Sequence, residues 1–423
     1  MNPEQLRKRL QRLGVKKGRA GITAPPRKPE SEISDFVPIE SLVNGREVLT
    51  DSGAYFVAET AYSLEHQHGG RALADVLRCS PHIAAHVSRD ESFASANLSQ
   101  LAFLDIETTG LAGGAGTLAF LIGVGVVESE HFILRQFFLR DPDEEPALLS
   151  GVAELLQDRS GLITYNGRSF DVPIVQTRFT MARRRFSFDH LPHLDLLPPA
   201  RRLWRGRYEN CSLGTLEGAV LNVQRSGEDV PGWMIPQLYV EYLRSGDARQ
   251  MQRVIYHNAE DILSMVTLAA HILETFGDPL SESRSGMDCL RLALWHDDLG
   301  HAAEADAAYR AALTRLRGLP ADQKPVLYER YGAFLKARNR RDEAFPLWEK
   351  WAACSPDDPS PCIELSKYYE WHARNIAEAQ EWAGQALLCL SHWPKGWRRD
   401  EAWREAQHRL ERLNRKQTTD EGR

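Results

Sequence analysis

The sequence lacks the features that mark secreted and membrane-spanning proteins. Its six cysteines are scattered without a CxxC pair, and no apolar run reaches the roughly 18 residues that a helix needs to cross a bilayer. The basic N-terminus is not followed by the apolar block of a secretion signal. We therefore expect no disulfide framework, no zinc site and no membrane partner, and we expect a cytoplasmic location.

Charge of one sign is not in large excess either, because 52 Lys and Arg stand against 58 Asp and Glu and the formal net charge is −6. This balance argues weakly against a general nucleic-acid coat protein. The distribution is uneven, however, since residues 178–207 hold eight arginines and two acids. Such a cluster can bind phosphates, and a solvated helix face is an equal alternative.

The composition of the chain changes along its length and divides it into five regions. Residues 1–44 are basic and polar, and we expect them to form a disordered arm. Residues 45–98 predict a small subdomain with a β-hairpin and a helix, and residues 99–278 hold a dense apolar core. Residues 285–415 are rich in Ala, Glu, Arg and Trp at helical spacing, and residues 416–423 are expected to be a disordered tail.

The apolar core region predicts an α/β layer fold. Three strands follow one another, then come a helix, a strand and a helix, and two further helical segments end the region. The predicted strands are 101–107, 117–128, 131–140 and 161–167, and the predicted helical segments are 146–157, 169–182, 237–245 and 248–275, the last as one or two helices.

The helical region contains a weak internal repeat. EADAAYRAAL at 304–313, EAFPLWEKWA at 343–352 and EAQEWAGQAL at 378–387 are offset by 39 and then 35 residues. They resemble tetratricopeptide helix pairs, whose period is about 34 residues. We therefore predict an all-α tetratricopeptide-like domain that binds a protein partner or extends a nucleic-acid track. An unrelated helical bundle is the alternative.

Two carboxylates end the first strand of the core region, in the stretch LAFLDIETTG at 101–110. Asp105 and Glu107 share one face of that strand because strand side chains alternate. Two unpaired charges against a core would cost several kcal/mol each, and a divalent cation removes this difficulty. Carboxylate oxygens suit Mg²⁺ or Mn²⁺. The alternative is a strand end at which both acids meet water.

Two more acids stand in separate segments. Asp171 begins a helix in TYNGRSFDVPIV, and Asp261 lies in HNAEDILSM one helical turn after His257. The i, i+4 spacing puts His257 and Asp261 on one helix face. Four carboxylates from three segments can converge on two cations about 4 Å apart, which activate a water and stabilise the leaving oxygen of a phosphodiester. An imidazole beside them can act as a general base.

Taken together, the motifs of residues 100–275 resemble the DEDD superfamily of ribonuclease-H-like proofreading exonucleases. More closely, they resemble the bacterial YprB-type ribonuclease-H-like proteins through LDIETTGLAGGAGTLAFLIGVG, TYNGRSFDVPIV, HLDLLPPARRLWR, CSLGTLE, DVPGWMIPQLY and HNAEDILSM. The resemblance implies a mixed sheet flanked by helices and a metal-dependent 3′–5′ exonuclease. It implies that two Mg²⁺ or Mn²⁺ ions are held by Asp105, Glu107, Asp171 and Asp261.

The third motif departs from the superfamily pattern, which has Tyr four residues before the last Asp or His five before it. Here His257 is at minus four and Tyr256 is at minus five. We interpret His257 as the residue that activates water, with a buried structural histidine as the alternative, and we expect Tyr256 to pack in the core. The exchange leaves open a second function, a catalytically weak adaptor that binds nucleic acid or protein on a nuclease scaffold.

Several further residues are candidate contacts to a single-stranded nucleic-acid end. Asn166 lies near the substrate in the superfamily, but Asn-Gly is also a common turn. Thr108 offers a hydroxyl after the first strand, and the glycine-rich loop that follows is expected to form a hairpin. Arg201, Arg202 and Arg205 can contact phosphates while Trp204 stacks on a base. Trp204 can equally be a packing anchor.

Overall fold

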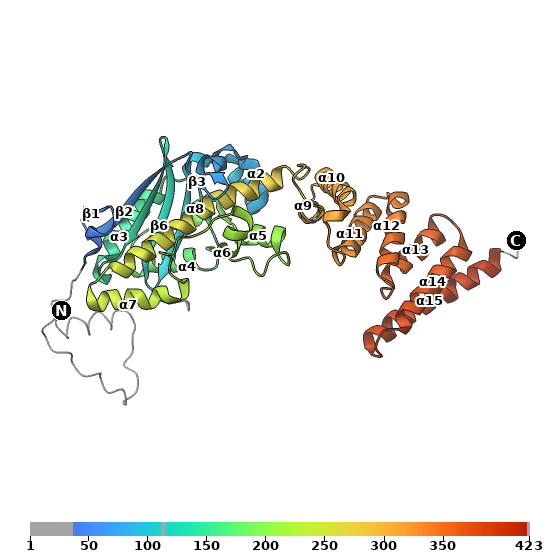
Figure 1. Cartoon of the computed structure of the whole chain (residues 1–423). Coiled ribbons are helices and arrows are strands. Elements are labelled where there is room, and N and C mark those ends of the chain that lie inside the picture. The colour runs from blue at the N-terminus through green and yellow to red at the C-terminus, as the bar shows by residue number, and fades with distance from the viewer. Residues whose placement is uncertain (1–36, 111–115, 421–423) are drawn as a thin grey trace, which may run out of the picture. The chain divides into compact units, whose positions relative to one another are not determined.

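The structure is a computed structural model, and it describes residues 37–110 and 116–420. The chain forms two compact units that divide after Gly277 (Figure 1). In the described ranges, no helix has both the length and the apolar character needed to span a membrane.

A seven-stranded mixed sheet forms the core of the first unit. Neighbouring strands are antiparallel from β1 to β5, whereas β5, β8 and β9 are parallel. The central strands β5 and β6 are apolar and buried on both faces, which matches their uninterrupted apolar runs. In spatial order the strands are β1 (Gly45–Thr50), β2 (Gly53–Ser63), β7 (His131–Phe138), β6 (Ala119–Glu128), β5 (Leu101–Thr108), β8 (Gly161–Thr164) and β9 (His193–Asp195). The predicted α/β class is confirmed.

Helices cover both faces of this sheet. The long helix α8 (Arg249–Gly277) packs on β5, β6 and β7, and α3 (Glu145–Leu156) packs on β2 and β7. Two neighbouring residues of β7 show that these helices lie on opposite faces, since consecutive strand side chains point to opposite sides. Gln136 hydrogen-bonds to α8, and Phe137 contacts α3. The remaining helices are α2 (Pro81–Ser88), α4 (Asp171–Met181), α5 (Leu197–Trp204), α6 (Leu213–Leu216) and α7 (Ile235–Ser245).

Short elements complete the first unit. They are the two-stranded sheet of β3 (Gln67–His68) and β4 (Arg71–Ala72), the π-helical turn η7 (Glu217–Leu221), and the 3₁₀ helices η1 (Ile39–Ser41), η2 (Leu73–Arg78), η3 (Glu91–Ser95), η4 (Leu98–Gln100), η5 (Pro142–Glu144), η6 (Phe188–His190) and η8 (Gly232–Met234). The helix predicted after the hairpin is therefore the 3₁₀ helix η2.

Residues 45–98 do not form the separate subdomain that the sequence predicted, because the hairpin of β1 and β2 belongs to the main sheet. β2 pairs with β7 along its length, so the hairpin extends the same sheet. Phe56 and Val57 are buried on its two faces and belong to the common core. Ile39 is also buried there, so the end of the predicted arm is ordered, because its apolar side chain finds a place in the core. Residues 1–36 lie outside the described residues.

The second unit is a run of packed helices. Its members pair in chain order as α9 with α10, α11 with α12 and α13 with α14, and α15 packs on α14. The three repeat stretches fall on α10, α12 and α14, the second helix of each pair. The helices are α9 (Gly286–Asp298), α10 (Ala302–Thr314), α11 (Gln323–Ala337), α12 (Arg341–Cys354), α13 (Ser360–Trp371), α14 (Ile376–Ser391) and α15 (Trp397–Asp420), with the 3₁₀ helix η9 (Leu316–Gly318).

The last helix differs from the prediction. We expected a disordered tail from residue 416, whereas α15 continues to Asp420. Lys416 lies 2.6 Å from the buried carboxylate of Glu370, and Leu413 of the same helix is fully buried. These contacts order a segment whose polar composition alone predicts disorder.

Candidate active site

Asp105 lies in a row of side chains that crosses three strands and faces α8. It is paired with Gly123 of β6, which is paired with Gln136 of β7. Asn258 of α8 reaches into this row: its Nδ2 donates to Asp105 Oδ2 at 2.7 Å, and its Oδ1 accepts from Gln136 Nε2 at 2.8 Å. A Cβ on Gly123 would stand only 2.2 Å from Asn258 Oδ1, so glycine is what lets α8 approach. The sequence motifs did not identify Asn258 or Gln136.

Asp171 meets the same strand from α4. It is the first residue of that helix, it is buried, and its Oδ1 accepts the backbone N–H of Ile106 at 3.2 Å. Ile106 stands between Asp105 and Glu107, so this bond joins the second motif to the first. Burial, together with repulsion from Asp195 and Asp261, outweighs the hydrogen bonds and raises the pKa of Asp171 to about 7.

His257 and Asp261 complete the cluster from α8. His257 Nε2 lies 3.6 Å from Asp261 Oδ2 and 3.9 Å from Glu107 Oε1. Glu107, His257 and Asp261 each place one potential ligand atom within 4.8 Å of the others. All three are at least partly buried, with about a seventh of each side chain exposed (14%, 15% and 17%). The local helical spacing predicted the His–Asp pair, and the tertiary fold brings Glu107 to it.

The imidazole of His257 is held by an acid outside the predicted set. Its Nδ1 lies 2.7 Å from Asp229 Oδ1, and a carboxylate can only accept, so Nδ1 carries the proton. Arg225 Nη1, 3.2 Å from the same nitrogen, is then only a close neighbour. In the neutral ring, the lone pair of Nε2 then faces Glu107 and Asp261. This arrangement serves a metal ligand or a general base equally well.

Arg225 is the largest omission of the sequence reasoning. Its guanidinium contacts Asp261 Oδ1, and it binds both oxygens of Glu217, at 2.6 and 2.8 Å. A fourth oxygen, on Asp229, lies 3.5 Å away. A single arginine in the loop segment NVQRSGEDV carries no motif, so periodicity and spacing could not have identified it.

The carboxylates of this cluster outnumber its cations. Burial, followed by repulsion from Asp261 and Asp171, raises the pKa of Asp105 and of Glu107 well above the ordinary carboxyl range. Burial also raises the pKa of Asp261, although His257 and Arg225 act against it. A divalent cation would relieve this repulsion, and the donors are oxygens with one imidazole nitrogen, so the residues fit Mg²⁺ or Mn²⁺.

A cavity of about 490 Å³ opens beside the cluster. Glu217, Arg225, Asp229, His257 and Asp261 line it, together with residues of the 213–218 and 230–232 segments. These five charged side chains are therefore open to the cavity, whereas Asp105, Glu107 and Asp171 do not line it.

The other predicted contacts lie apart from this cluster or point inward. Thr108 is buried and donates to the carbonyl oxygen of Gly110 at 2.9 Å. Asn166 is exposed in a left-handed turn (φ +65°), and its N–H donates to Asp195 Oδ1 at 2.8 Å. Asp195 is buried and also accepts the N–H of Leu197, so it organises the turn and the start of α5. Residues 113 and 114 of the glycine-rich loop lie outside the described residues.

The arginine-rich stretch and Tyr256 also differ from expectation. Trp204 is 4% exposed and stacks on His271 with ring centroids 5.8 Å apart, so its ring packs inside the unit and cannot stack on a base. On the same helix Arg201 is exposed and Arg202 is half-buried, and Arg205, just after the helix, is exposed. Tyr256 is half-buried rather than in the core, and its hydroxyl accepts the N–H of Ser226, next to Arg225, at 3.1 Å.

Comparison with known proteins assigns the class that this fold and site define. The model of the RNase_H superfamily matches residues 102–273, which span β5 to α8 and contain the whole cluster. The protein named "Uncharacterized protein YprB" from Bacillus subtilis (strain 168) is 32% identical over 345 residues, which cover 79% of this chain and 81% of YprB. The chain belongs to the YprB family and carries an RNase H-like domain.

Proposed function

We propose that this protein is a metal-dependent nuclease that hydrolyses phosphodiester bonds of DNA or RNA, acting as a 3′–5′ exonuclease on single-stranded ends. The observation that carries the proposal is the meeting of Glu107, His257 and Asp261 beside an open cavity. The RNase H superfamily match supports the same chemistry, because it covers every segment that supplies these acids.

Each residue of the cluster has a distinct part in this proposal. Asp105, Glu107, Asp171 and Asp261 would hold Mg²⁺ or Mn²⁺, which would stabilise charge on the attacking and leaving oxygens. Asn258 orients Asp105 through its amide. With its Nδ1 proton held by Asp229, His257 presents Nε2 as the acceptor for a proton from the attacking water. Arg201 and Arg202 of α5 and Arg205 just after it are proposed phosphate contacts, and Asn166 is proposed to contact the substrate.

The test compares Asp105→Asn with the wild type. We expect release of mononucleotides from labelled single-stranded DNA or RNA in Mn²⁺ to fall roughly a thousandfold, because a cluster that acts as a unit loses most of its rate with one member. EDTA should abolish release by the wild type. Glu370→Gln in the second unit is the matched control and should keep the activity. Cleavage at the wild-type rate by Asp105→Asn would refute the mechanism.

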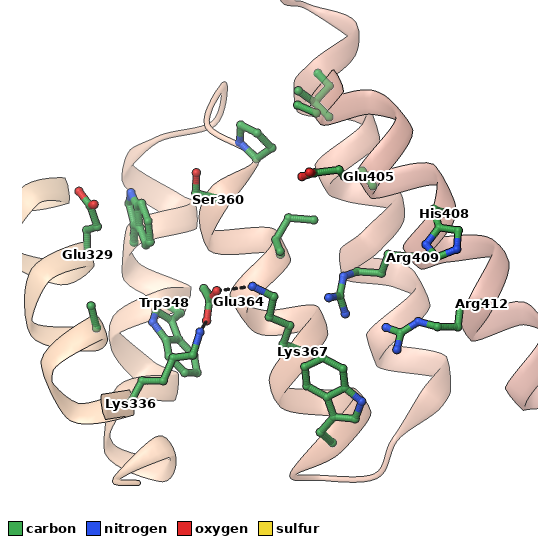
Figure 2. A pocket seen from close by; sticks show the side chains of 18 of the residues that line it. Glu329, Lys336, Trp348, Ser360, Glu364, Lys367, Glu405, His408, Arg409 and Arg412 are labelled. Carbon is green, nitrogen blue, oxygen red and sulfur yellow. Dashed lines mark hydrogen bonds and ion pairs between the residues drawn. The ribbon is translucent and has the colours of Figure 1, made fainter. Parts of the chain in front are cut away.

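A second candidate function, partner binding, is favoured by a groove in the second unit. A cavity of about 870 Å³ lies among α11, α12, α13 and α15 (Figure 2). Its wall includes Trp348, Trp351, Trp371 and Trp393, with aliphatic residues between them. We infer that the helix pairs are tetratricopeptide-like repeats and that this groove is their binding surface.

The charges of the groove favour an acidic polypeptide with apolar side chains. Figure 2 shows Lys336 and Lys367 beside Glu364, with Arg409 and Arg412 pointing into the same space from α15. Glu364 is thus shared by two lysines, and Arg409 and Arg412 both bind the buried Glu370, so four cationic side chains of the wall stand near one acid of the wall, Glu364. Glu329 and Glu405 stand elsewhere on the wall and reduce this excess without removing it.

A labelled peptide of alternating Glu and Leu, followed by fluorescence anisotropy, tests this inference. We expect binding that weakens with salt and that Lys367→Glu abolishes, because this change reverses one charge of the groove. Binding of a single-stranded oligonucleotide at this groove, with no binding of the peptide, would instead make it part of a nucleic-acid track.

A further inference from the structure

We propose that the guanidinium of Arg225 takes the place of a second divalent cation, so that the site holds one ion instead of the two that the sequence predicted. The inference rests on the proposed function, because it concerns the same cluster. It concerns how the acids divide their oxygens between a metal and the chain's own donors.

Asp261 shows this division most clearly. Its Oδ1 accepts from Nη2 of Arg225, while its Oδ2 faces the other way, 3.6 Å from His257 Nε2. A carboxylate shared by two metal ions would offer one oxygen to each. Here the second position is already held by a permanent cation of the chain, since arginine keeps its charge under all ordinary conditions.

The other acids are divided in the same manner. Asp105 gives Oδ2 to the amide of Asn258 at 2.7 Å, and Asp171 gives Oδ1 to the N–H of Ile106 at 3.2 Å. The second oxygen of each acid would be the one offered to an ion, and Glu107 directs Oε1 toward His257. These oxygens, with Oδ2 of Asp261, could serve as ligands of one ion, and water would fill its remaining positions. A second ion would have to compete with three hydrogen bonds.

Arg225 is held firmly in this position. Both oxygens of Glu217, which is buried, bind it in a two-pronged pair, and the hydroxyl of Tyr256 tethers the next residue. Its guanidinium also lines the 490 Å³ cavity with His257 and Asp261. A phosphate that enters the cavity would therefore meet a fixed positive charge there. In two-ion sites the second metal ion provides this electrostatic stabilisation of the phosphate.

The experiment counts bound ions. Purified full-length chain is titrated with Mn²⁺ alone, and the electron paramagnetic resonance signal of free Mn²⁺ gives the number bound. We expect one ion per chain for the wild type, two for Arg225→Gln, and one for Arg225→Lys, which keeps the charge. Arg135→Gln is the matched control, because it removes comparable ion pairs, to Glu59 and Glu128, from another part of the sheet. This variant should still bind one ion.

Each result decides between the alternatives. Two ions in the wild type would overturn the inference while leaving the nuclease proposal intact, and this holds even if Arg225→Gln fails to fold. One ion in both the wild type and a folded Arg225→Gln would show that Arg225 does not limit the count. Zero ions in the wild type would overturn the metal-dependent proposal itself, together with the inference.

Discussion

The two units both bury carboxylates, but they treat them differently. In the second unit the side chain of Glu370 is 0% exposed and touches three cations, Arg409, Arg412 and Lys416, at 2.6 to 3.0 Å. In the first unit Asp105, Glu107, Asp171 and Asp261 repel one another, and the guanidinium of Arg225 contacts Asp261. The first arrangement is complete without a ligand, and the second is not.

This difference separates a structural charge from a functional one. A buried acid that is fully matched by cations holds its helices together, and removing it leaves cations unpaired. A surplus of buried acids opposes folding, because it raises their pKa and costs free energy. A chain that keeps such a surplus beside a cavity has the electrostatics of a site that awaits a cation.

The largest contrast is expected from removing one negative charge in each unit. Glu370→Gln should lower the free energy of unfolding by about 3 kcal/mol, because three cations lose their common partner. Asp105→Asn should leave it unchanged or raise it when no metal is present, since the amide oxygen still accepts from Asn258 and repulsion falls. Denaturation in urea with EDTA measures both. Equal losses in the two variants would erase the proposed difference.

Mn²⁺ should stabilise the first unit alone. At a hundredfold excess over its dissociation constant, a ligand that binds only the folded state adds about 2.7 kcal/mol to the free energy of unfolding. Calorimetry with and without Mn²⁺ measures the shift, and Glu370→Gln identifies which transition belongs to the second unit. Asp261→Asn serves as the control and should lose the shift. Stabilisation of the second unit's transition would contradict the assignment of the ion.

One glycine in each unit allows the packing of the two units to be compared by substitution with alanine. Gly123→Ala should cost about 2 kcal/mol, because its Cβ would collide with Asn258 and Ile262 of α8. It should also slow hydrolysis, since Asn258 holds Asp105. Gly384→Ala on α14 meets nothing within 4 Å and should stabilise its helix by up to about 1 kcal/mol. Thermal unfolding and the nuclease assay test the pair. Full activity in Gly123→Ala would show that Asn258 is not a positioning residue.

The smallest effect is expected on the surface of α5. Arg201→Ala should weaken binding of a single-stranded oligonucleotide uniformly across sequences and reduce the salt slope by about one, because one phosphate contact is lost. Fluorescence anisotropy at several salt concentrations measures this slope. Arg46→Ala on β1, an edge strand remote in the sheet order from β8 and β9, is the control. An unchanged slope for Arg201→Ala would remove α5 from the proposed path.

Local periodicity was sufficient for much of the fold and for part of the site. The strands at 101–107 and 131–140 follow from apolar patterns within each segment, and the structure has them as β5 and β7. The pattern at 248–275 predicted one or two helices, and the structure has the single helix α8. The same periodicity placed Asp105 with Glu107, and His257 with Asp261. These pairs are near neighbours in the chain, so strand and helix geometry already determines their common face.

Only the tertiary structure decided how these pairs meet and which residues join them. Arg225 and Asp229 reach the cluster from a separate loop, and Asn258 bonds to Asp105 across 153 residues, so no local pattern reports these contacts. Trp204 turned inward and α15 extended to Asp420 for the same reason: burial against distant residues outweighs local composition. The sequence by itself therefore determined which acids share a face of a strand or helix. The packing of α8 and of the 217–229 segment determined which positively charged side chains of the protein lie beside those acids.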